Sequence, residues 1–263
     1  MLRYLFDRLK PNSADVQELK YLRPLLRSLP KQQRIAIDVG ANVGSITIAL
    51  AHMGFVVYAL EPHPQTRQRL AHAVGHLSKS GRVKILELAA SDHDGTADLL
   101  VGSNDTVSTL EASWTTIAFP DYFADKRMIR VPTRMLSTLL PEQGVHQVGF
   151  LKIDVEGHET NVLRGTLTDR TRLEPPVIVM FEANQRFPEK AEECLAILAA
   201  HGYERFDVFV KEGPILLAKA RFTGHRLPKE WRTYEGKYFY ANIVAYHASV
   251  MARWALPDMP ESR

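Results

Sequence analysis

Two short apolar runs, Ile35–Val39 and Val56–Leu60, narrow the choice of fold and ligand more than any other part of the chain. A turn containing Gly40 and Gly44 follows the first run, and an acidic residue, Glu61, directly follows the second. A strand, a glycine-containing turn, a helix and a second strand ending in a carboxylate form the arrangement by which α/β domains hold adenosine. The pattern therefore predicts a cofactor that contains adenosine.

Each part of this pattern has a physical role. Gly40 and Gly44 lack a Cβ, so the backbone can turn sharply and approach a ligand closely. The N–H groups of the helix that opens near Val43 then face that ligand. Glu61 can accept hydrogen bonds from both ribose hydroxyls. An ordinary strand-to-helix turn can also contain glycine, but Glu61 at this distance favours a cofactor site.

Asn42, one of the three residues between the two glycines, helps to decide which adenosine cofactor the site suits. Asn42 stands where a dinucleotide's pyrophosphate needs an unobstructed backbone. This disfavours a dinucleotide cofactor, and with it a dinucleotide oxidoreductase. S-adenosylmethionine has no phosphate and is the adenosine cofactor that the sequence favours. A catalytically silent protein that binds an adenosine cofactor or acts as a scaffold is an alternative from another class.

Composition is that of an ordinary globular protein with one large α/β domain and short additions. The chain has 263 residues, of which 45% are hydrophobic and 24% charged. The net charge of +3 is too small to indicate a nucleic-acid partner. The single cysteine, Cys194, lies in an amphipathic stretch and is expected to be a buried, inert thiol.

Strand-like and helical segments alternate from residue 35 onward, which predicts a doubly wound, mostly parallel sheet with helices on both faces. The final run, 238–246, follows an irregular stretch and is expected to return antiparallel at the edge. Residues 92–147 differ, with extended pieces at 96–101 and 129–133 joined by a loop. The expected strands are 35–39, 56–60, 83–88, 148–153, 177–181 and 204–210, and the expected helices are 45–53, 64–77, 159–164 and 189–201.

We expect three segments along the chain: an N-terminal helical extension (1–34), the main domain (35–250) and a C-terminal tail (251–263). The extension places Leu2, Leu5, Phe6 and Leu9 on one face, and its prolines, Pro24 among them, are expected to break it into short pieces. Packing onto the domain is the favoured fate of this basic amphipathic start, and contact with a membrane surface is the less favoured one. The sequence shows neither a cleavable signal pattern nor an apolar run of about 18 residues, so we expect a cytoplasmic protein.

Three titratable side chains follow the run 148–153 at alternate positions: Asp154, Glu156 and His158. Ligands of open α/β sheets bind beyond the carboxyl ends of the strands, so these groups are candidates for proton transfer or for binding charge. Alternatively, Asp154 caps the next helix and the other two are solvated. All three are metal-ligand types, but alternate spacing in an irregular segment is not a specific pattern, and no metal site is predicted.

Four segments together resemble the FkbM family of S-adenosylmethionine-dependent methyltransferases, over roughly residues 35–183. The segment around Asp154 is the most specific, because Lys-Ile-Asp-Val-Glu-Gly is close to a family signature. The segments are Asp38-Val39-Gly40-Ala41-Asn42-Val43-Gly44, Glu61-Pro62-His63-Pro64, Ala89-Ala90-Ser91-Asp92-His93-Asp94-Gly95 and Lys152-Ile153-Asp154-Val155-Glu156-Gly157-His158-Glu159, the last with Val162-Leu163-Arg164-Gly165.

The resemblance implies a class I methyltransferase (Rossmann-like) fold and O-methylation of a hydroxyl on a sugar, glycolipid or natural product. It implies that Gly40, Ala41 and Asn42 line the methionine part of the cofactor, and that Asp38 and Gly44 of the same segment also belong to the cofactor-binding residues. It also implies that Glu61 holds the ribose, that Ala90, Ser91 and Asp92 border the adenine, and that Asp154 lies beside the methyl donor. The unmatched flanks are expected to shape the acceptor pocket.

Methyl transfer to oxygen needs a proton acceptor, because the hydroxyl loses its proton as it attacks. His158 is a candidate base because imidazole titrates near neutral pH; Asp154 or Glu156 could orient it or replace it. Glu182, after the run 177–181, is a further candidate, and a structural hydrogen bond is its alternative role. Residues 103–110, with the aromatics Trp114, Phe119, Tyr122 and Phe123, suit a small-molecule or carbohydrate acceptor, or else close a small core of their own.

Overall fold

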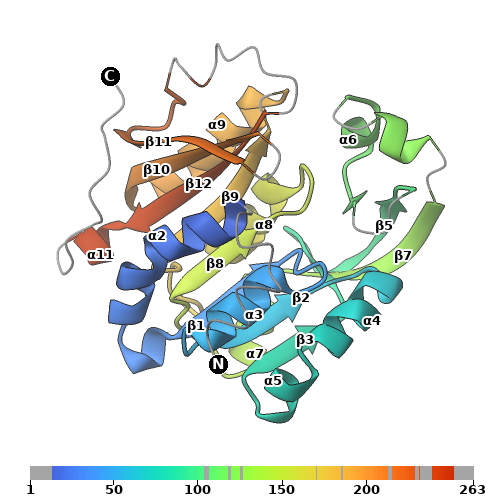
Figure 1. Ribbon diagram of the computed structural model, residues 1–263, viewed down its shortest axis with the longest axis horizontal. Helices are drawn as coiled ribbons and strands as arrows, with labels where there is room; N and C mark the ends of the chain where they lie inside the picture. The colour runs from blue at the N-terminus through green and yellow to red at the C-terminus, as the bar shows by residue number, and fades with distance from the viewer. Residues whose placement is uncertain are drawn as a thin grey trace.

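An eight-stranded sheet forms the centre of the protein (Figure 1). The computed structural model describes residues 14–103, 107–117, 120–124, 127–169, 171–184, 186–212, 215–228, 231 and 239–251. The strand order is β11-β10-β12-β9-β8-β1-β2-β3. The strands are β1 (Ile35–Val39), β2 (Val56–Leu60), β3 (Val83–Leu86), β8 (Phe150–Ile153), β9 (Ile178–Asn184), β10 (Tyr203–Glu212), β11 (Ile215–Thr223) and β12 (Phe239–His247).

The predicted doubly wound sheet is confirmed. β1 pairs in parallel with β2 and β8, and the parallel pairing continues to β3 on one side and β9 on the other. β12 is antiparallel to both of its neighbours, β9 and β10. All six strands expected from residue 35 to residue 210 are present. β1, β8 and β9 are mostly apolar runs that bury side chains on both faces of the sheet.

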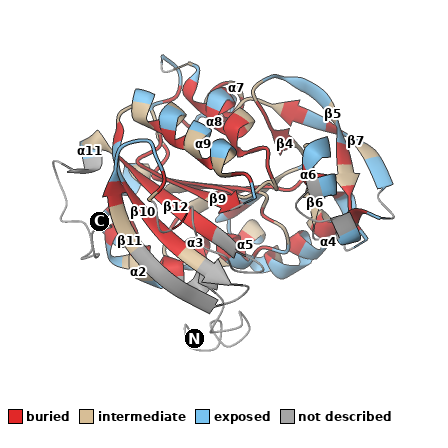
Figure 2. Cartoon of the chain, turned by 90° about the horizontal axis from the view of Figure 1, so that it is seen from above, coloured by how far each residue is buried: buried red, intermediate tan, exposed pale blue. Residues whose placement is uncertain are grey.

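Helices cover both faces of the sheet, and each layer has its own core (Figure 2). The period-two alternation of β1 sends Ala36 to one layer and Ile37 to the other. One layer contains α2 (Ala14–Ser28), α3 (Ser45–His52), α4 (Pro64–Ala73) and α5 (Gly75–Lys79). The other contains α7 (Leu136–Glu142), α8 (Glu159–Leu167) and α9 (Pro188–Ala200).

The last strand corrects the sequence prediction. β12 is antiparallel as expected, but it lies inside the sheet between β9 and β10 and not at the edge. The edge is β11, which the sequence analysis missed, although β11 pairs with β10 along its whole length. The two strands form a hairpin, so β11 can border the sheet while the later strand is inserted beside β9.

A second, four-stranded sheet stands beside the first, at the right of Figure 1. It contains both extended pieces expected between residues 92 and 147, as β5 (Gly95–Val101) and β7 (Arg127–Arg134), which pair antiparallel. β4 (Ala89–Ala90) and β6 (Ser108–Thr109) complete it. Its small core contains Leu99, Val101 and Val131. The helices of this region, α6 (Ala112–Ile117) and the short 3-10 turn Pro120–Phe123, were not predicted.

The described part of the N-terminal extension, α2, packs on the domain. α2 buries Leu19, Leu22 and Leu26 in the same core as α3. Pro24 lies inside this helix, so the predicted break at Pro24 is wrong. The apolar face at Leu2–Leu9 and the tail beyond residue 251 lie outside the described residues.

Two further sequence predictions concern the environment of Cys194 and the presence of apolar, membrane-spanning segments. Cys194 is buried on α9, as predicted, and burial raises the pKa of its thiol. A search of the described part of the chain for a helix with the length and apolar character needed to cross a membrane finds none.

Candidate active site

The turn after β1 brings two backbone segments into direct contact. Gly40 has φ +76°, and a Cβ built on it would lie 1.9 Å from the carbonyl oxygen of Asp154. The Gly40 and Ala41 N–H groups donate to Leu60 O at 3.1 and 3.0 Å, and Asp154 N–H donates to Val39 O at 3.1 Å. The turn and the segment after β8 therefore pack without any side chain between them.

Glu61 closes the turn from the end of β2. Its Oε2 accepts a hydrogen bond from Asn42 N and its Oε1 accepts one from His63 N, both at 2.9 Å. The residue is 5% exposed, and burial raises the pKa of its carboxyl despite these two donors. A carboxylate can accept about four hydrogen bonds, so capacity remains for a ligand.

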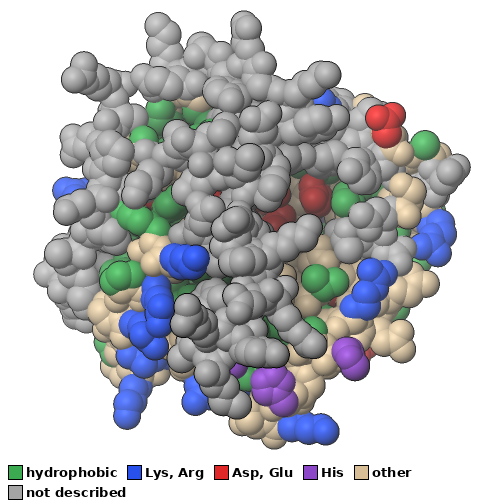
Figure 3. Space-filling model, in the orientation of Figure 1, with side chains coloured by type: hydrophobic (Ala, Val, Ile, Leu, Met, Phe, Trp, Pro, Cys, Tyr) green, Lys and Arg blue, Asp and Glu red, His purple; other side chains and the backbone are tan. Residues whose placement is uncertain are grey.

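A cavity opens beyond the carboxyl ends of β1, β2 and β8 and encloses about 660 Å³ including its mouth. The space-filling view shows acidic side chains at the bottom of a hollow (Figure 3). The wall includes these predicted site residues: Gly40, Asn42, Glu61, Ala90, Asp154, Glu156 and His158. It also includes Leu88, Ala89 and Leu99, which offer an apolar surface, and Ser108, Thr109 and Leu110 from the loop proposed for the acceptor.

Three of the predicted residues support the wall from behind and do not line it. Asp38 is fully buried and accepts a hydrogen bond from Thr47 Oγ1 at 2.5 Å, and burial raises the pKa of its carboxyl. Ala41 is buried in the layer of α3, and Gly44, at φ +93°, caps that helix. These residues hold the turn in place.

Lys152 connects this support to the cavity. Its Nζ lies 3.8 Å from Asp38 Oδ1 and donates to Asp154 Oδ2 at 2.9 Å. The Lys152 side chain is almost wholly buried, whereas that of Asp154 is 36% exposed. The buried ammonium therefore holds the Asp154 carboxyl at the cavity wall.

Ser91 and Asp92 also lie off the wall and anchor β4 to α8. Ser91 Oγ lies 3.0 Å from His158 Nε2, and Asp92 Oδ2 accepts from Asn161 Nδ2 at 3.1 Å. The other ring nitrogen of His158, Nδ1, lies 2.9 Å from Glu111 Oε1. Both imidazole nitrogens are therefore engaged, which favours a positioning role for His158 over that of a free base.

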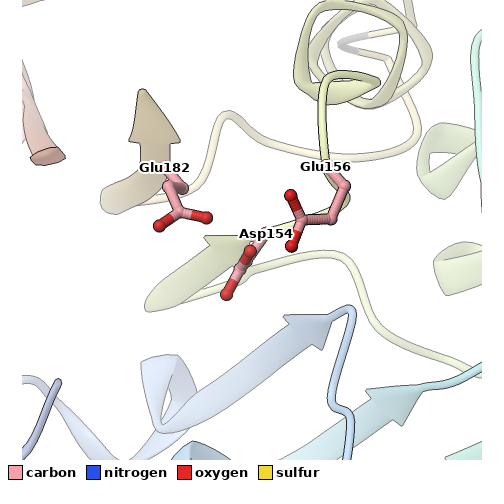
Figure 4. Close-up of side chains that lie close together, drawn as sticks. All are labelled: Asp154, Glu156 and Glu182. Carbon is pink, nitrogen blue, oxygen red and sulfur yellow. The ribbon is translucent and has the colours of Figure 1, made fainter. Parts of the chain in front are cut away.

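Three carboxylates meet at the edge of the cavity (Figure 4): Asp154 at the end of β8 and Glu156 in the following loop, both on the wall, and Glu182 on β9 close to them. One oxygen from each lies within 4.8 Å of the others. The sequence places Asp154 and Glu156 together, and the longer β9 brings Glu182 to them. Oxygen ligands at such separations suit a divalent cation, but acidic groups commonly lie this close without one.

Glu156 is held in an unusual conformation. Its φ is +55°, a region that few non-glycine residues adopt. Its Oε2 accepts a hydrogen bond from Trp114 Nε1 at 2.9 Å, and its backbone oxygen accepts one from Thr109 Oγ1 at 2.7 Å. Burial and the neighbouring Asp154 raise the pKa of this carboxyl to about 8.

Glu111 and Lys190 contribute to the site but were missed from the sequence. Lys190 Nζ on α9 lies 3.3 Å from Glu111 Oε2 and donates to Gly157 O at 2.9 Å. The hydrogen bonds with His158 and Lys190 lower the pKa of the Glu111 carboxyl. Neither residue belongs to a motif, and only the fold brings residues 111, 157 and 190 together.

The raised pKa of Glu156 predicts a pH-dependent stability. Between about pH 4.5 and 8, Glu156 ionises in the unfolded chain but stays protonated in the folded one, so the wild type loses stability as pH rises. We expect Glu156→Gln to have a similar free energy of unfolding at pH 5 and one about 2 kcal/mol higher at pH 8. Urea unfolding at both pH values, with Asp98→Asn as an exposed control, measures this; a difference independent of pH would contradict it.

Comparison with known proteins agrees with this geometry. The family model "Methyltransferase FkbM domain" matches residues 38–205. The chain is 28% identical to the 31-O-demethyl-FK506 methyltransferase FkbM of Streptomyces tacrolimicus over 69% of this chain and 75% of that protein. It is 25% identical to the 2-O-methyltransferase NoeI of Sinorhizobium fredii over 59% of this chain and 65% of that protein.

Solved methyltransferase structures resemble the fold at low identity. The FkbM methyltransferase of Methylobacillus flagellatus has a TM-score of 0.45 and 14% identity, over 82% of this chain and 44% of that one. An S-adenosylmethionine-dependent methyltransferase of Agrobacterium tumefaciens has a TM-score of 0.48 and 8% identity, over 89% and 62%. The family match covers more than half of the chain and rules out the alternative of a dinucleotide oxidoreductase. The chain belongs to the FkbM family of methyltransferases, and its cofactor is S-adenosylmethionine.

Proposed function

We propose that the protein transfers the methyl group of S-adenosylmethionine to a hydroxyl of a sugar, glycolipid or natural product. The observation that carries the proposal is Glu156, a carboxyl with a pKa of about 8 that lines the cavity together with Asp154 and lies close to Glu182. A base whose pKa is close to the working pH is suited to take a proton from a hydroxyl. The two relatives named above are both O-methyltransferases by name.

The cavity wall fits the cofactor in three parts. Glu61 would hold the ribose hydroxyls, and the apolar surface of Leu88, Ala90 and Leu99 would border the adenine. The bare backbone of Gly40 would allow the methionine part to approach, and the carboxylates of Asp154, Glu156 and Glu182 would face the positively charged sulfonium. Bound cofactor supplies an activated methyl group, and the residues of this chain must align the acceptor oxygen with it.

The polar groups then have separate roles. Glu156 would take the hydroxyl proton, while Asp154 would be held by Lys152 close to the donor. His158 would position the loop through Ser91 and Glu111. The Thr109 hydroxyl and the stacked rings of Trp114 and Phe187 would border the acceptor, because such surfaces suit polyols and other amphipathic molecules.

The proposal is tested by incubating the protein with methyl-labelled S-adenosylmethionine and a panel of acceptors that offer hydroxyl, amine or carboxyl groups. We expect labelled methyl ethers from at least one hydroxyl acceptor, identified by mass spectrometry. Label found only on amines or carboxyls would contradict O-methylation. Cofactor binding without transfer to any acceptor would favour the silent, scaffold alternative.

Glu61→Gln is expected to weaken the binding of S-adenosylmethionine and of its product, S-adenosylhomocysteine, by about tenfold or more each. Both Glu61 oxygens accept backbone N–H groups, so the amide nitrogen of glutamine must face one of these donors and leave it unsatisfied, at a cost of about 1–3 kcal/mol. Isothermal titration measures both dissociation constants. Glu87→Gln, at a side chain 70% exposed, is the control, and equal affinity in both variants would contradict the ribose role.

A further inference from the structure

Trp114 connects two parts of the fold beside the carboxylate cluster. It lies on α6, is 4% exposed and forms a buried cluster of its own with Phe187. The two rings stack with centroids 4.7 Å apart and an interplanar angle of 18°. Because Phe187 directly precedes α9, the stack joins the region of the second sheet to the helical layer of the first.

The same indole contacts the loop that carries Glu156. Its N–H donates to Glu156 Oε2, and its ring packs so closely on Gly157 that a Cβ there would lie 2.5 Å from a ring atom. Glu156 and Gly157 have φ of +55° and +99°. The residues that hold this strained turn therefore include Trp114 and Thr109, neither of which belongs to the family signature around Asp154.

The charges that face Glu156 come from three elements. Lys152 lies on β8 and Asp154 directly follows that strand. Glu182 lies on β9, and Glu159 is the first residue of α8. Lys152 is hydrogen-bonded to Asp154, and Glu159 Oε1 accepts from Val155 N and Gly157 N at 3.1 and 3.2 Å. The surroundings of Glu156 are thus mainly acidic, and they favour a ligand that carries a positive charge.

We propose that Trp114 is a positioning residue that holds the Glu156 carboxylate in this cluster and so makes the cavity prefer S-adenosylmethionine, a cation at sulfur, over S-adenosylhomocysteine, which is neutral there. The inference rests on the proposed function only for the place of the sulfonium beside Asp154. Its consequence is that transfer of the methyl group removes the charge that the cluster attracts, which favours release of the product.

The test is the ratio of the two dissociation constants, S-adenosylhomocysteine over S-adenosylmethionine, measured by isothermal titration from pH 6.5 to 9. The ratio measured with Glu156→Gln at each pH is the baseline, because the charged sulfur lowers the pKa of the amino group of S-adenosylmethionine relative to that of S-adenosylhomocysteine. Relative to this baseline, we expect the wild-type ratio to rise about tenfold with a midpoint near pH 8, where Glu156 ionises.

Trp114→Phe separates the hydrogen bond from the stacking, because it keeps a ring against Phe187 and Gly157 and removes only the N–H donor. We expect it to lower the ratio about twofold to fivefold at pH 8 and to move the midpoint to higher pH, since the N–H favours the ionised carboxyl. Trp231→Phe is the matched control, because Trp231 is equally buried but lies in the large core of the layer that contains α7, α8 and α9.

Each outcome is decisive. A wild-type ratio that rises above the Glu156→Gln baseline, together with a lower ratio and a shifted midpoint in Trp114→Phe, supports the proposal. An unchanged ratio in Trp114→Phe overturns it, as does an equal loss of affinity for both ligands, which would indicate a purely structural role. If the wild type binds neither ligand, the proposed function itself is overturned, and this result cannot be mistaken for the loss of discrimination alone.

Discussion

Gly40→Ala is expected to abolish detectable binding of S-adenosylmethionine, a loss of more than about 100-fold, and to lower the free energy of unfolding by about 2–4 kcal/mol. The new Cβ would stand 1.9 Å from the Asp154 carbonyl oxygen, and φ at this position is +76°. The turn and the loop after β8 must separate to relieve the collision. Because both segments form the cavity wall, the cofactor site opens with them.

A matched substitution separates the collision from the backbone strain. Gly81 has nearly the same φ, +73°, but nothing lies within 4 Å of a Cβ built on it. Gly81→Ala should therefore lose only about 1 kcal/mol and bind the cofactor normally. Urea unfolding and isothermal titration measure both variants. If they behave alike, the close approach of Gly40 to Asp154 does not shape the site.

Glu156→Gln is expected to lower kcat on the identified acceptor by about 10²–10⁴-fold while changing cofactor affinity at neutral pH by less than tenfold. Glutamine keeps the shape of the side chain and an oxygen for the Trp114 N–H but cannot accept the hydroxyl proton. In the wild type, kcat/KM should rise with pH, with a midpoint near pH 8 and a plateau above it, because only the ionised carboxyl is a base. The variant should show no such step.

The comparison of Glu156 with His158 tests the assignment of the base. Both imidazole nitrogens of His158 have partners, so His158→Ala should reduce kcat less than Glu156→Gln does. Glu193→Gln, which removes an exposed carboxylate paired with Arg164, should leave kcat unchanged. A larger loss in His158→Ala, with the pH step retained in Glu156→Gln, would make His158 the base.

Local sequence patterns predicted those features of the fold and the site that depend on residues close together in the chain. The β1 turn, Glu61 and the loop after β8 are each specified within a few residues, and the structure brings their side chains to one cavity. The order of the last strands could not be predicted in this way. Insertion of β12 between β9 and β10 depends on pairing between segments far apart in the chain, and β11 follows β10 too closely to show a separate pattern.

The roles of the individual site residues also could not be predicted from local sequence patterns. The spacing of Asp154, Glu156 and His158 suggested three comparable candidates, but their partners distinguish them. Lys152 holds Asp154, burial beside Trp114 raises the pKa of Glu156, and His158 is engaged by Ser91 and Glu111. Trp114 and Glu111 reach the loop from α6 and the residue just before it, and contacts across more than forty residues leave no periodic signal in the sequence.

The second sheet has a consequence for how this protein could change during evolution. Leu99, Val101 and Val131 form a small interior separate from the two large ones, and the same region supplies Ser108 and Thr109 to the cavity. Substitutions at Ser108 and Thr109 can be absorbed by that interior and leave the eight-stranded sheet, with the turn after β1 that it carries, intact. Under the proposed function, selectivity for the acceptor would then be a separable module, free to diverge while methyl-donor binding is conserved.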